Sequence, residues 1–315
     1  SARRYRLQVD ELSGQEIHER FPGFRADDGW RGLFERRAGY LDVEACVVAH
    51  IEEAVKLGAE LQTGVEGHGW SAGPQCIDVE TSVGRFNAKR LVVTAGPWAP
   101  QLLRDLGLTL LNSQSIPDTL GAMPTALRGH ALRAGMATQG SGHGTHQGGV
   151  EGLLQLRRKP QFWYPAPAEY RADCGCPAYL FDLPDGIFYG LPAIDDFGLK
   201  AAEHTGGAAV ANPMNVNREL DEGDRQRVEQ FLAAHLPGVG RPLSHHSVCM
   251  YTLTPDEHFV VDRHPADERI VFAAGLSGHG FKFTGVLGEA LADLALTGST
   301  ELPIGFLSLK RFAKQ

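Results

Sequence analysis

The clearest signal of the fold is an apolar run followed by closely spaced glycines, Ile270-Val271-Phe272-Ala273-Ala274-Gly275-Leu276-Ser277-Gly278-His279-Gly280-Phe281-Lys282-Phe283. Its apolar start predicts a buried strand, and residues 284–296 after it predict a helix. The glycines between them leave backbone N–H groups free at a helix N-terminus, which favours an anion or an electron-rich carbonyl group. Lys282 adds a positive charge that could hold a carboxylate. From this loop alone, an ordinary strand–helix turn with a surface lysine remains an alternative.

The N-terminal third of the chain continues the α/β pattern. Residues 41–57 predict a helix, because apolar residues recur at four-residue spacing and Gly58 follows as a stop signal. Residues 59–65 predict a short strand. The continuous apolar run 90–95 predicts a strand buried on both faces of a parallel sheet. That strand ends in Gly96-Pro97-Trp98, where a ligand could approach the backbone closely, and a helix through Leu106 is expected.

The middle of the chain predicts an antiparallel sheet. Expected strands, separated by proline and glycine turns, are residues 162–164, 178–181 and 186–191. An amphipathic helix over 222–235 precedes two more strands, 248–253 and 258–262. Residues 111–152 are rich in glycine without periodicity and suggest an insert that need not pack.

The expected fold class is therefore α/β with a discontinuous cofactor domain and an antiparallel-sheet substrate domain. The predicted segments are 1–40 and 153–250 for the substrate domain, 41–110 and 251–315 for the cofactor domain, and 111–152 for the insert.

Composition narrows the class of protein. The 315 residues carry a formal net charge of -8, which argues against a phosphate-tracking nucleic-acid surface. No apolar run is long enough to span a membrane, and the first residues lack the apolar core of a signal peptide. Five cysteines at irregular spacing favour a reducing compartment, so a cytoplasmic location is expected. Cys174-Gly175-Cys176 is interpreted as a pair of loop thiols.

Two near-contiguous segments carry a resemblance to a known family. They are Cys249-Met250-Tyr251-Thr252-Leu253-Thr254-Pro255-Asp256-Glu257-His258-Phe259-Val260-Val261-Asp262 and Ala273 to Phe283. They resemble the C-terminal signature of the monomeric sarcosine oxidase and N-methyltryptophan oxidase family, FAD-dependent amine oxidases of the D-amino-acid-oxidase-like superfamily. Weaker similarity covers most of the chain outside the insert and implies an incomplete FAD-binding Rossmann-like domain.

The resemblance implies roles for individual residues. Cys249 matches the cysteine that bonds the flavin covalently, and Lys200 matches the lysine that promotes the reaction with oxygen. Lys282 matches the lysine that binds the substrate carboxylate. The residues matching the substrate pocket are Tyr189, His204 and Tyr251. Those expected against the flavin are Val65, Gly96, Trp98, Gly275, Gly278, His279 and Gly280, together with Lys282.

The implied reaction is oxidation of an N-methyl amino acid to an imine, which hydrolyses to the amino acid and formaldehyde while oxygen becomes hydrogen peroxide. FAD, an amino-acid substrate and oxygen are the implied partners, and a monomer without nucleic-acid, membrane or metal partners is expected. N-methyl-L-tryptophan remains an alternative substrate.

The chain departs from the family pattern at its start. Family members open with a strand and a Gly-x-Gly-x-x-Gly turn that holds the FAD pyrophosphate, and this chain contains no such turn. The resemblance places its opening well inside the family sequence. Truncation at the N-terminus, weak FAD binding and an uncovered sheet edge are therefore expected. A non-catalytic remnant of such an oxidase stays open as an alternative.

A metal hydrolase is the other rival. His245, His246, Cys249, His258 and His264 cluster in the sequence. No H-E-x-x-H helix is present, and adjacent histidines on a strand would point to opposite faces, so no metal site is predicted.

Overall fold

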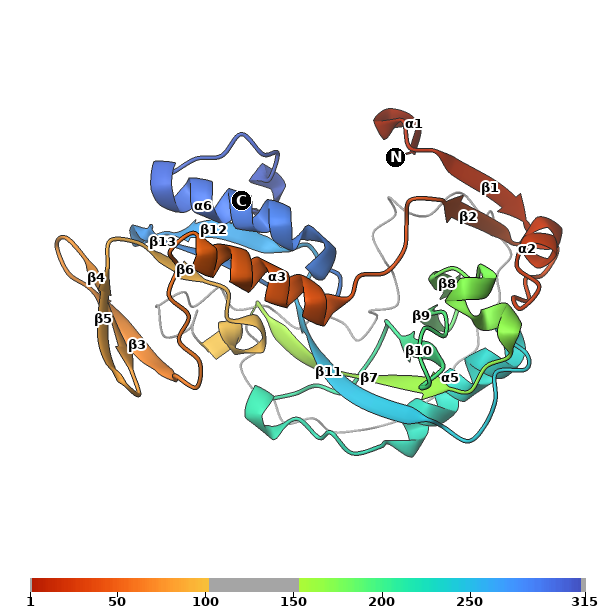
Figure 1. Cartoon of the computed structure of the whole chain (residues 1–315). Helices are drawn as coiled ribbons and strands as arrows, with labels where there is room; N and C mark the ends of the chain where they lie inside the picture. Colours follow the sequence, from red (N-terminus) through yellow and green to blue (C-terminus); the bar gives the residue numbers. More distant parts are fainter. Residues whose placement is uncertain (1, 102–152, 313–315) are drawn as a thin grey trace, which may run out of the picture. The chain divides into compact units, whose positions relative to one another are not determined.

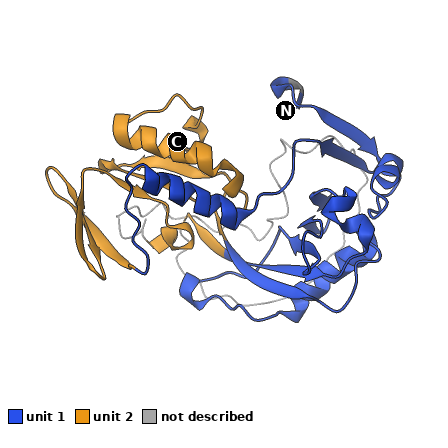
Figure 2. Cartoon of the chain, viewed as in Figure 1, with its two compact units in different colours: residues 1–64, 157–250 blue, residues 65–156, 251–315 orange. Residues whose placement is uncertain are grey.

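The computed structural model describes residues 2–101 and 153–312 (Figure 1). Its contacts divide the chain into two compact units, each built from two segments (Figure 2). Unit 1 comprises Ser1–Gly64 and Arg157–Met250, and unit 2 comprises Val65–Leu156 and Tyr251–Gln315. The predicted insert, 111–152, lies outside the described residues, as does the end of the helix expected through Leu106.

Within the described part of unit 1, the largest element is a five-stranded antiparallel sheet. Its strand order is β11-β7-β10-β9-β8, and strands β7 and β11 continue past the unit boundary. The strands are β7 (Gln155–Tyr164), β8 (Tyr179–Leu183), β9 (Gly186–Leu191), β10 (Leu199–Glu203) and β11 (His245–Leu253). β8 and β9 are joined by a short turn, and β9 pairs with β10 through Ala201 opposite Gly190.

One face of this sheet is covered by helix α5 (Glu222–His235), as Figure 1 shows. Asp221 begins the helix by accepting a hydrogen bond from Asp224 N through its side chain. Alternate strand residues then pack against the helix in one apolar cluster, which includes Phe162, Phe188, Leu199, Ala201, Val228 and Phe231. We call this side the core face.

The first residues of unit 1 form a small sheet of their own. Helix α1 (Ala2–Tyr5) precedes β1 (Val9–Ser13), which pairs with β2 (Arg31–Glu35), and helix α2 (Gly14–Arg20) connects the two strands. Ser13 and Glu16 form a capping box at the start of α2. The sequence did not predict this sheet, because its strands are short and rich in charged residues.

Helix α3 (Val43–Lys56) confirms the predicted helix, and Asp42 caps it. The apolar side chains at four-residue spacing would be expected to pack against another element. In the described structure, however, α3 has no buried residue. Exposures of its apolar side chains lie between 37 and 53%, at Val43, Val47, Val48, Ile51 and Val55.

Unit 2 contains a mixed sheet of order β12-β13-β6 in its described part, formed by β12 (Val260–His264), β13 (Asp267–Ala274) and β6 (Leu91–Val93). β13 is buried on both faces, as its apolar run predicted. Ile270 and Phe272 face one cluster, while Val271 and Ala273 pack in the cluster that includes residues of helix α6 (Thr284–Thr297).

Strand β6 corrects one expectation of the sequence. It runs parallel to β13 at an edge of the sheet. Val92 is 46% exposed, so this strand is not buried on both faces. The strand expected over 59–65 is also wrong, because no strand forms between the end of helix α3 and Gly67. An antiparallel meander follows, formed by β3 (Gly67–Ala72), β4 (Ile77–Thr81) and β5 (Gly84–Ala88).

Candidate active site

The glycine loop between β13 and α6 is the first candidate, and it belongs to unit 2. Its backbone turns through positive φ values of 63° at Gly275, 48° at Ser277 and 79° at Gly278. Ser277 is not glycine, so its conformation is strained, and hydrogen bonds hold it there. The Ser277 N–H donates to Thr252 O at 3.0 Å, and Ser277 Oγ donates to Gly275 O at 3.0 Å.

Two glycines of the loop are required by close packing. A Cβ at Gly275 would lie 2.4 Å from Thr254 Cγ2, and a Cβ at Gly278 would lie 2.2 Å from Tyr251 Cε2. The ring of Tyr251, only 8% exposed, therefore packs directly on the loop backbone. The structure thus places Tyr251 against Gly278 of the loop.

The N-terminus of α6 is free to interact with an acceptor. Residues Phe281–Phe283 form a 3-10 turn, and neither this turn nor α6 has a side-chain cap hydrogen bond. Lys282 is exposed, with its ammonium 5.7 Å from the centre of the Phe283 ring. An uncapped helix start next to a lysine suits a group that carries negative charge.

The side chain of His279 makes contacts that fix the position of this loop. Its imidazole Nε2 lies 3.1 Å from Glu257 O, and its ring lies 4.9 Å from that of Phe259. Burial lowers the pKa of His279, and the nearby Lys282 charge acts in the same direction, while the bond to Glu257 opposes it. The side chain ties the loop to residue 257.

Of the remaining cofactor candidates of unit 2, Gly96 and Trp98 follow β6, and Val65 precedes β3. Gly96 has a φ of 53°, and its carbonyl accepts a hydrogen bond from Thr252 Oγ1 at 3.4 Å. No described atom lies within 4 Å of a Cβ built there, so the backbone of Gly96 is open to a ligand. Trp98 is 45% exposed, and Val65 is half-buried outside any strand.

The second group of candidates lies in unit 1, on the side of the five-stranded sheet opposite the core face. We call this the site face and define it by Trp163, Tyr189 and Lys200. Lys200 pairs with Trp163 on one side and with Leu191 on the other. Because side chains alternate along a strand, these residues point away from Phe162, Phe188 and Ala201. Site-face residues can therefore bind a ligand without belonging to the apolar core.

Lys200 is the most unusual residue of the site face. Its ammonium lies 5.1 Å from the centre of the Trp163 ring and makes no hydrogen bond or ion pair with any described residue. Burial lowers its pKa, and the charges of Cys249 and Glu44 oppose that shift. A half-buried lysine without an ionic partner is expensive for stability, which is typical of a functional group.

Three other candidates accompany Lys200. The rings of Tyr189 and His204 meet edge to face, 6.2 Å apart. Cys249 is an exposed thiol on β11 and is close enough to influence the Lys200 charge. The structure therefore brings Tyr189 and His204 together within unit 1, while Cys249 on β11 and Lys200 on β10 lie on either side of β7.

An aromatic cluster on the site face was missed by the sequence analysis. The ring of His245 lies 5.2 Å from that of Trp163 and 4.8 Å from that of Phe197. Trp163 thus sits between Lys200 and His245. The register of β7 with β10 places Trp163 beside Lys200, and no local pattern in the sequence reveals that register.

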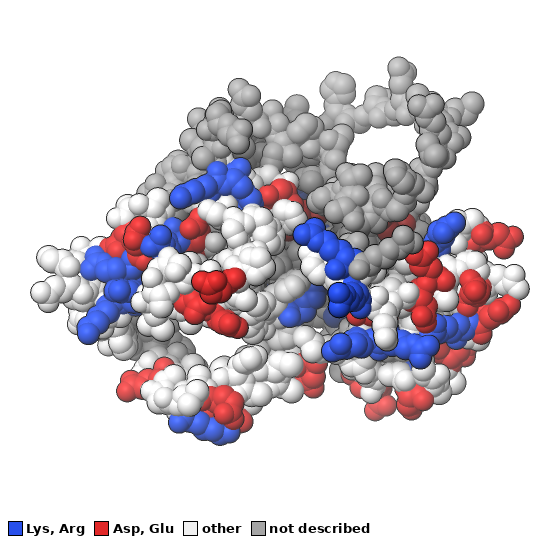
Figure 3. Space-filling model, turned by 90° about the horizontal axis from the view of Figure 1, so that it is seen from above, with Lys and Arg blue, Asp and Glu red and all other residues white. Residues whose placement is uncertain are grey.

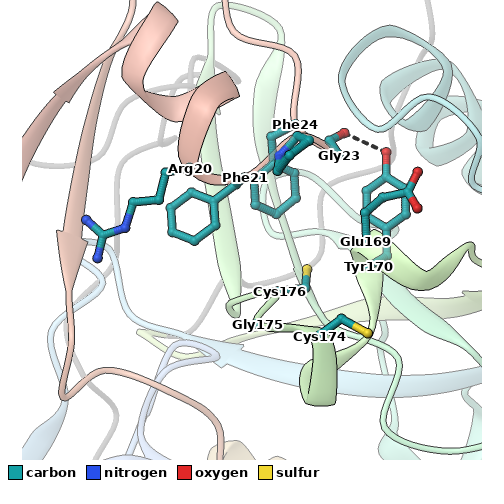
Figure 4. A pocket seen from close by; sticks show the side chains of 10 residues that line it. Arg20, Phe21, Gly23, Phe24, Glu169, Tyr170, Cys174, Gly175 and Cys176 are labelled. Atoms are coloured by element: carbon teal, nitrogen blue, oxygen red, sulfur yellow. Dashed lines mark hydrogen bonds between the residues drawn. The ribbon is translucent and has the colours of Figure 1, made fainter.

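A pocket of about 200 Å³ lies elsewhere in unit 1 and contains none of the candidates (Figure 4). Phe24, Tyr170 and Cys176 in its wall belong to the core-face cluster. The Tyr170 hydroxyl lies 2.5 Å from Gly23 O, the bond drawn in Figure 4, and 2.6 Å from Pro237 O. Burial raises the pKa of the Cys176 thiol to about 12.

The histidines that could suggest a metal site have other neighbours in the described part of the structure. No group of three potential metal ligands is present there. His264 accepts a hydrogen bond from Ala266 N, and His245 packs on aromatic rings. Acidic and basic side chains are interspersed on the face shown in Figure 3. No described helix has the length and apolarity needed to cross a bilayer.

Comparison with known proteins identifies the class. The chain matches the FAD dependent oxidoreductase family over residues 1–294, and it belongs to that family. It is 33% identical over 313 residues to monomeric sarcosine oxidase of Bacillus sp. (strain B-0618), covering 99% of this chain and 70% of that protein. It is 32% identical over 321 residues to N-methyl-L-tryptophan oxidase of Yersinia pestis (strain Pestoides F), with coverages of 99% and 72%.

The fold agrees with this assignment. Glycine oxidase from Geobacillus kaustophilus has a similar structure, with a TM-score of 0.70, 17% identity, and coverage of 98% of this chain and 69% of that one. The predicted α/β class with antiparallel sheets is confirmed. The assignment of chain segments to a cofactor and a substrate domain stays a prediction.

In unit 2, the glycine loop fits one part of a flavin. Gly275 and Gly278 carry no side chain, and the uncapped start of α6 offers N–H groups to a carbonyl or an anion. On unit 1, Cys249 and Lys200 provide an exposed thiol and a cation with no ionic partner among the described residues.

Proposed function

We propose that the chain catalyses the FAD-dependent oxidation of an N-methyl amino acid of the sarcosine type, with oxygen as the electron acceptor. The observation that carries the proposal is Lys200, a half-buried ammonium near Cys249 whose closest partner is the Trp163 ring. Bound FAD would accept two electrons from the amine and pass them to oxygen. The names of the Bacillus and Yersinia relatives support this reaction class.

The side chains would divide the work. The Lys200 ammonium stabilises the negative charge that oxygen acquires during reduction, because that charge develops where water is partly excluded. Tyr189, His204 and Tyr251 would contact the amine substrate, and Lys282 would bind the carboxylate of that substrate. Substrate must release the ammonium proton before it reacts, so the rate rises with pH.

Cys249 would hold the flavin covalently. The exposed thiol and the nearby Lys200 cation support this proposal. Forming a thioether to the flavin 8α carbon removes one hydrogen from the thiol and one from the methyl group, and oxygen accepts both as hydrogen peroxide. The remaining flavin contacts are proposed at Val65, Gly96, Trp98, Gly275, Gly278, His279 and Gly280.

The flavin bond provides the first test. Purified wild-type protein loaded with FAD should give a yellow pellet after acid precipitation, and Cys249→Ser should leave the colour in the supernatant. Cys46→Ser is the matched control, since Cys46 is a half-buried thiol on α3 outside the proposed site. A colourless wild-type pellet would contradict the covalent link.

Peroxide release provides the second test and separates the alternatives. Sarcosine should support hydrogen peroxide formation at air saturation. N-methyl-L-tryptophan is the second candidate substrate, because Trp163, Phe197 and His245 form an aromatic cluster on the site face. A higher kcat/KM for N-methyl-L-tryptophan would favour that reading. Bound flavin without peroxide from either amine would show the non-catalytic alternative.

Two further expectations remain proposals. The relative from Bacillus is named a monomeric enzyme, which supports a monomer for this chain. A cytoplasmic location rests on the cysteine pattern alone, and fractionation of the native cells would test it.

A further inference from the structure

Lys159 is a buried cation in β7 that the proposed reaction does not use. The residue is 2% exposed. Its ammonium donates to three successive backbone carbonyls, at 2.6 Å to His204 O, 2.9 Å to Thr205 O and 2.7 Å to Gly206 O. All three hydrogens of the ammonium are therefore matched by acceptors from one short loop.

Burial of the Lys159 ammonium costs free energy, so its presence inside the sheet needs an explanation. Burying an ammonium carries a large desolvation penalty unless its charge is fully bonded. The three carbonyls provide that bonding only while the loop keeps its path. The buried charge and the loop conformation are consequently coupled. A different conformation of the loop would leave the Lys159 ammonium without its hydrogen-bond acceptors.

The same loop is also held from its other side. Glu203, the residue before His204, accepts two hydrogen bonds from the Arg227 guanidinium of α5, at 2.6 and 2.8 Å. Glu203 Oε1 also accepts from Thr205 Oγ1 at 2.9 Å. Lys159 and Arg227 thus fix the backbone on both sides of His204.

Backbone bonds complete the clamp. The His204 N–H donates to Ile187 O at 2.7 Å, and Ile187 N donates to Thr205 Oγ1 at 3.1 Å. A Cβ at Gly207 would lie 2.4 Å from Arg158 O, so only glycine lets the loop pass this close to β7. The consequence is a fixed backbone at His204, whose ring lies edge-to-face with that of Tyr189.

We propose that Lys159 is a positioning residue that holds the His204 imidazole in its working orientation toward the amine substrate. This inference rests on the proposed function, since His204 is there a wall of the substrate pocket. Lys159 acts through His204 and does not touch the substrate itself.

A double-mutant cycle tests the inference in FAD-loaded enzyme. Lys159→Met should lower kcat/KM for the amine by roughly tenfold to a hundredfold, as expected when a pocket residue is misplaced by about 1 Å. Most of the loss should appear in KM, because the oxygen reaction at Lys200 does not involve His204. In a His204→Ala background, Lys159→Met should change kcat/KM by less than about twofold. If the two substitutions instead lowered kcat/KM by independent factors that multiply in the double variant, the inference would be overturned.

Conservative and matched variants sharpen the result. Lys159→Arg keeps the charge and the donors and should retain more activity than Lys159→Met. Lys56→Met removes a lysine that is 64% exposed on α3 and should leave kcat/KM unchanged. Where Lys159→Met does not fold, Lys159→Gln replaces it in the cycle under the same criteria.

Amide hydrogen exchange gives a readout independent of turnover. In Lys159→Met, the amides of His204 and Arg158, which bond Ile187 O and Ala208 O, should exchange at least about tenfold faster than in wild type. Unchanged exchange in a folded variant would overturn the inference. A wild-type enzyme without amine-dependent oxygen uptake would instead refute the proposed function, while the exchange result would still report on the clamp.

Discussion

The ring of Tyr251 occupies the space that any side chain at position 278 would need. A Cβ at Gly278 would lie 2.2 Å from Tyr251 Cε2, and the φ of 79° at this glycine is unfavourable for other residues. Gly278→Ala should therefore lower the free energy of unfolding by about 2 kcal/mol or more. Urea unfolding would measure the loss, and bound FAD per chain should fall with it.

Gly288→Ala serves as the control for that experiment. Gly288 lies in α6, and nothing described lies within 4 Å of a Cβ built there. Alanine at this exposed helical position should stabilise the chain by up to about 1 kcal/mol. Equal destabilisation by both substitutions would mean that packing against Tyr251 is not the cause.

Lys200→Met should separate stability from oxygen reactivity. The variant should be at least as stable as wild type, because it removes a half-buried ammonium that has no ionic partner among the described residues. Its reaction with oxygen should slow by a hundredfold or more, on the order of the loss of one electrostatic stabiliser. Stopped-flow reoxidation of the reduced enzyme would measure this rate, and a wild-type rate would refute the role of Lys200.

The lowered pKa of Lys200 also gives a pH signature. Between that lowered pKa and the ordinary value of about 10.4, the unfolded chain binds more protons at this lysine than the folded chain does. The stability advantage of Lys200→Met should hence be largest near neutral pH and shrink as pH rises through this window. Chemical unfolding at several pH values would show the trend, and an advantage that grows with pH would contradict it.

His279→Gln should show a pH dependence of the same sign in a lower pH range, because the folded-state pKa is lowered here as well. At pH 7.5 the loss of the bond to Glu257 O should cost about 1 kcal/mol. Burial lowers the pKa of His279, so wild type loses stability as pH falls below the ordinary value of about 6.5. The gap between wild type and variant should narrow from pH 7.5 to pH 5. A constant gap would show that His279 does not titrate differently on folding.

Tyr170→Phe should destabilise the chain without affecting turnover. The Tyr170 hydroxyl is fully buried and bonds the carbonyls of Gly23 and Pro237. Its removal should cost about 1–3 kcal/mol, measured by thermal or urea unfolding. The residue lies on the core side of the sheet, so kcat/KM should stay at the wild-type value. Tyr40→Phe, at a position 43% exposed, should change neither quantity.

Several elements could be predicted from sequence because their signals are local. Strand β9 and helix α5 have the predicted bounds, since glycine and proline turns flank the strand and Pro237 follows the helix. The glycine loop from Gly275 was recognised from a buried strand that ends in closely spaced glycines. These patterns lie within a few residues of the elements they define.

Other features depend on partners that a single sequence does not reveal. The stripe on α3 predicted a packed helix, yet Val47 and Val55 remain exposed. The contact of Trp163 with Lys200 follows from the register of β7 with β10. The sequence does not distinguish Lys159 from a surface lysine, because the three backbone carbonyls that accept its hydrogen bonds come from a loop distant in sequence. The strand expected over 59–65 failed because β propensity alone does not supply a pairing neighbour.

The alternation of residues along β9 and β10 has an evolutionary consequence. Phe188, Leu199 and Ala201 are packed in the core, whereas Tyr189 and Lys200 face the other way. Substitutions that change the reaction and substitutions that lower the stability of the fold therefore fall on different positions, which alternate along these strands. A lineage can explore new amine substrates at positions such as Tyr189 and Lys200 while Phe188, Leu199 and Ala201 keep the protein folded.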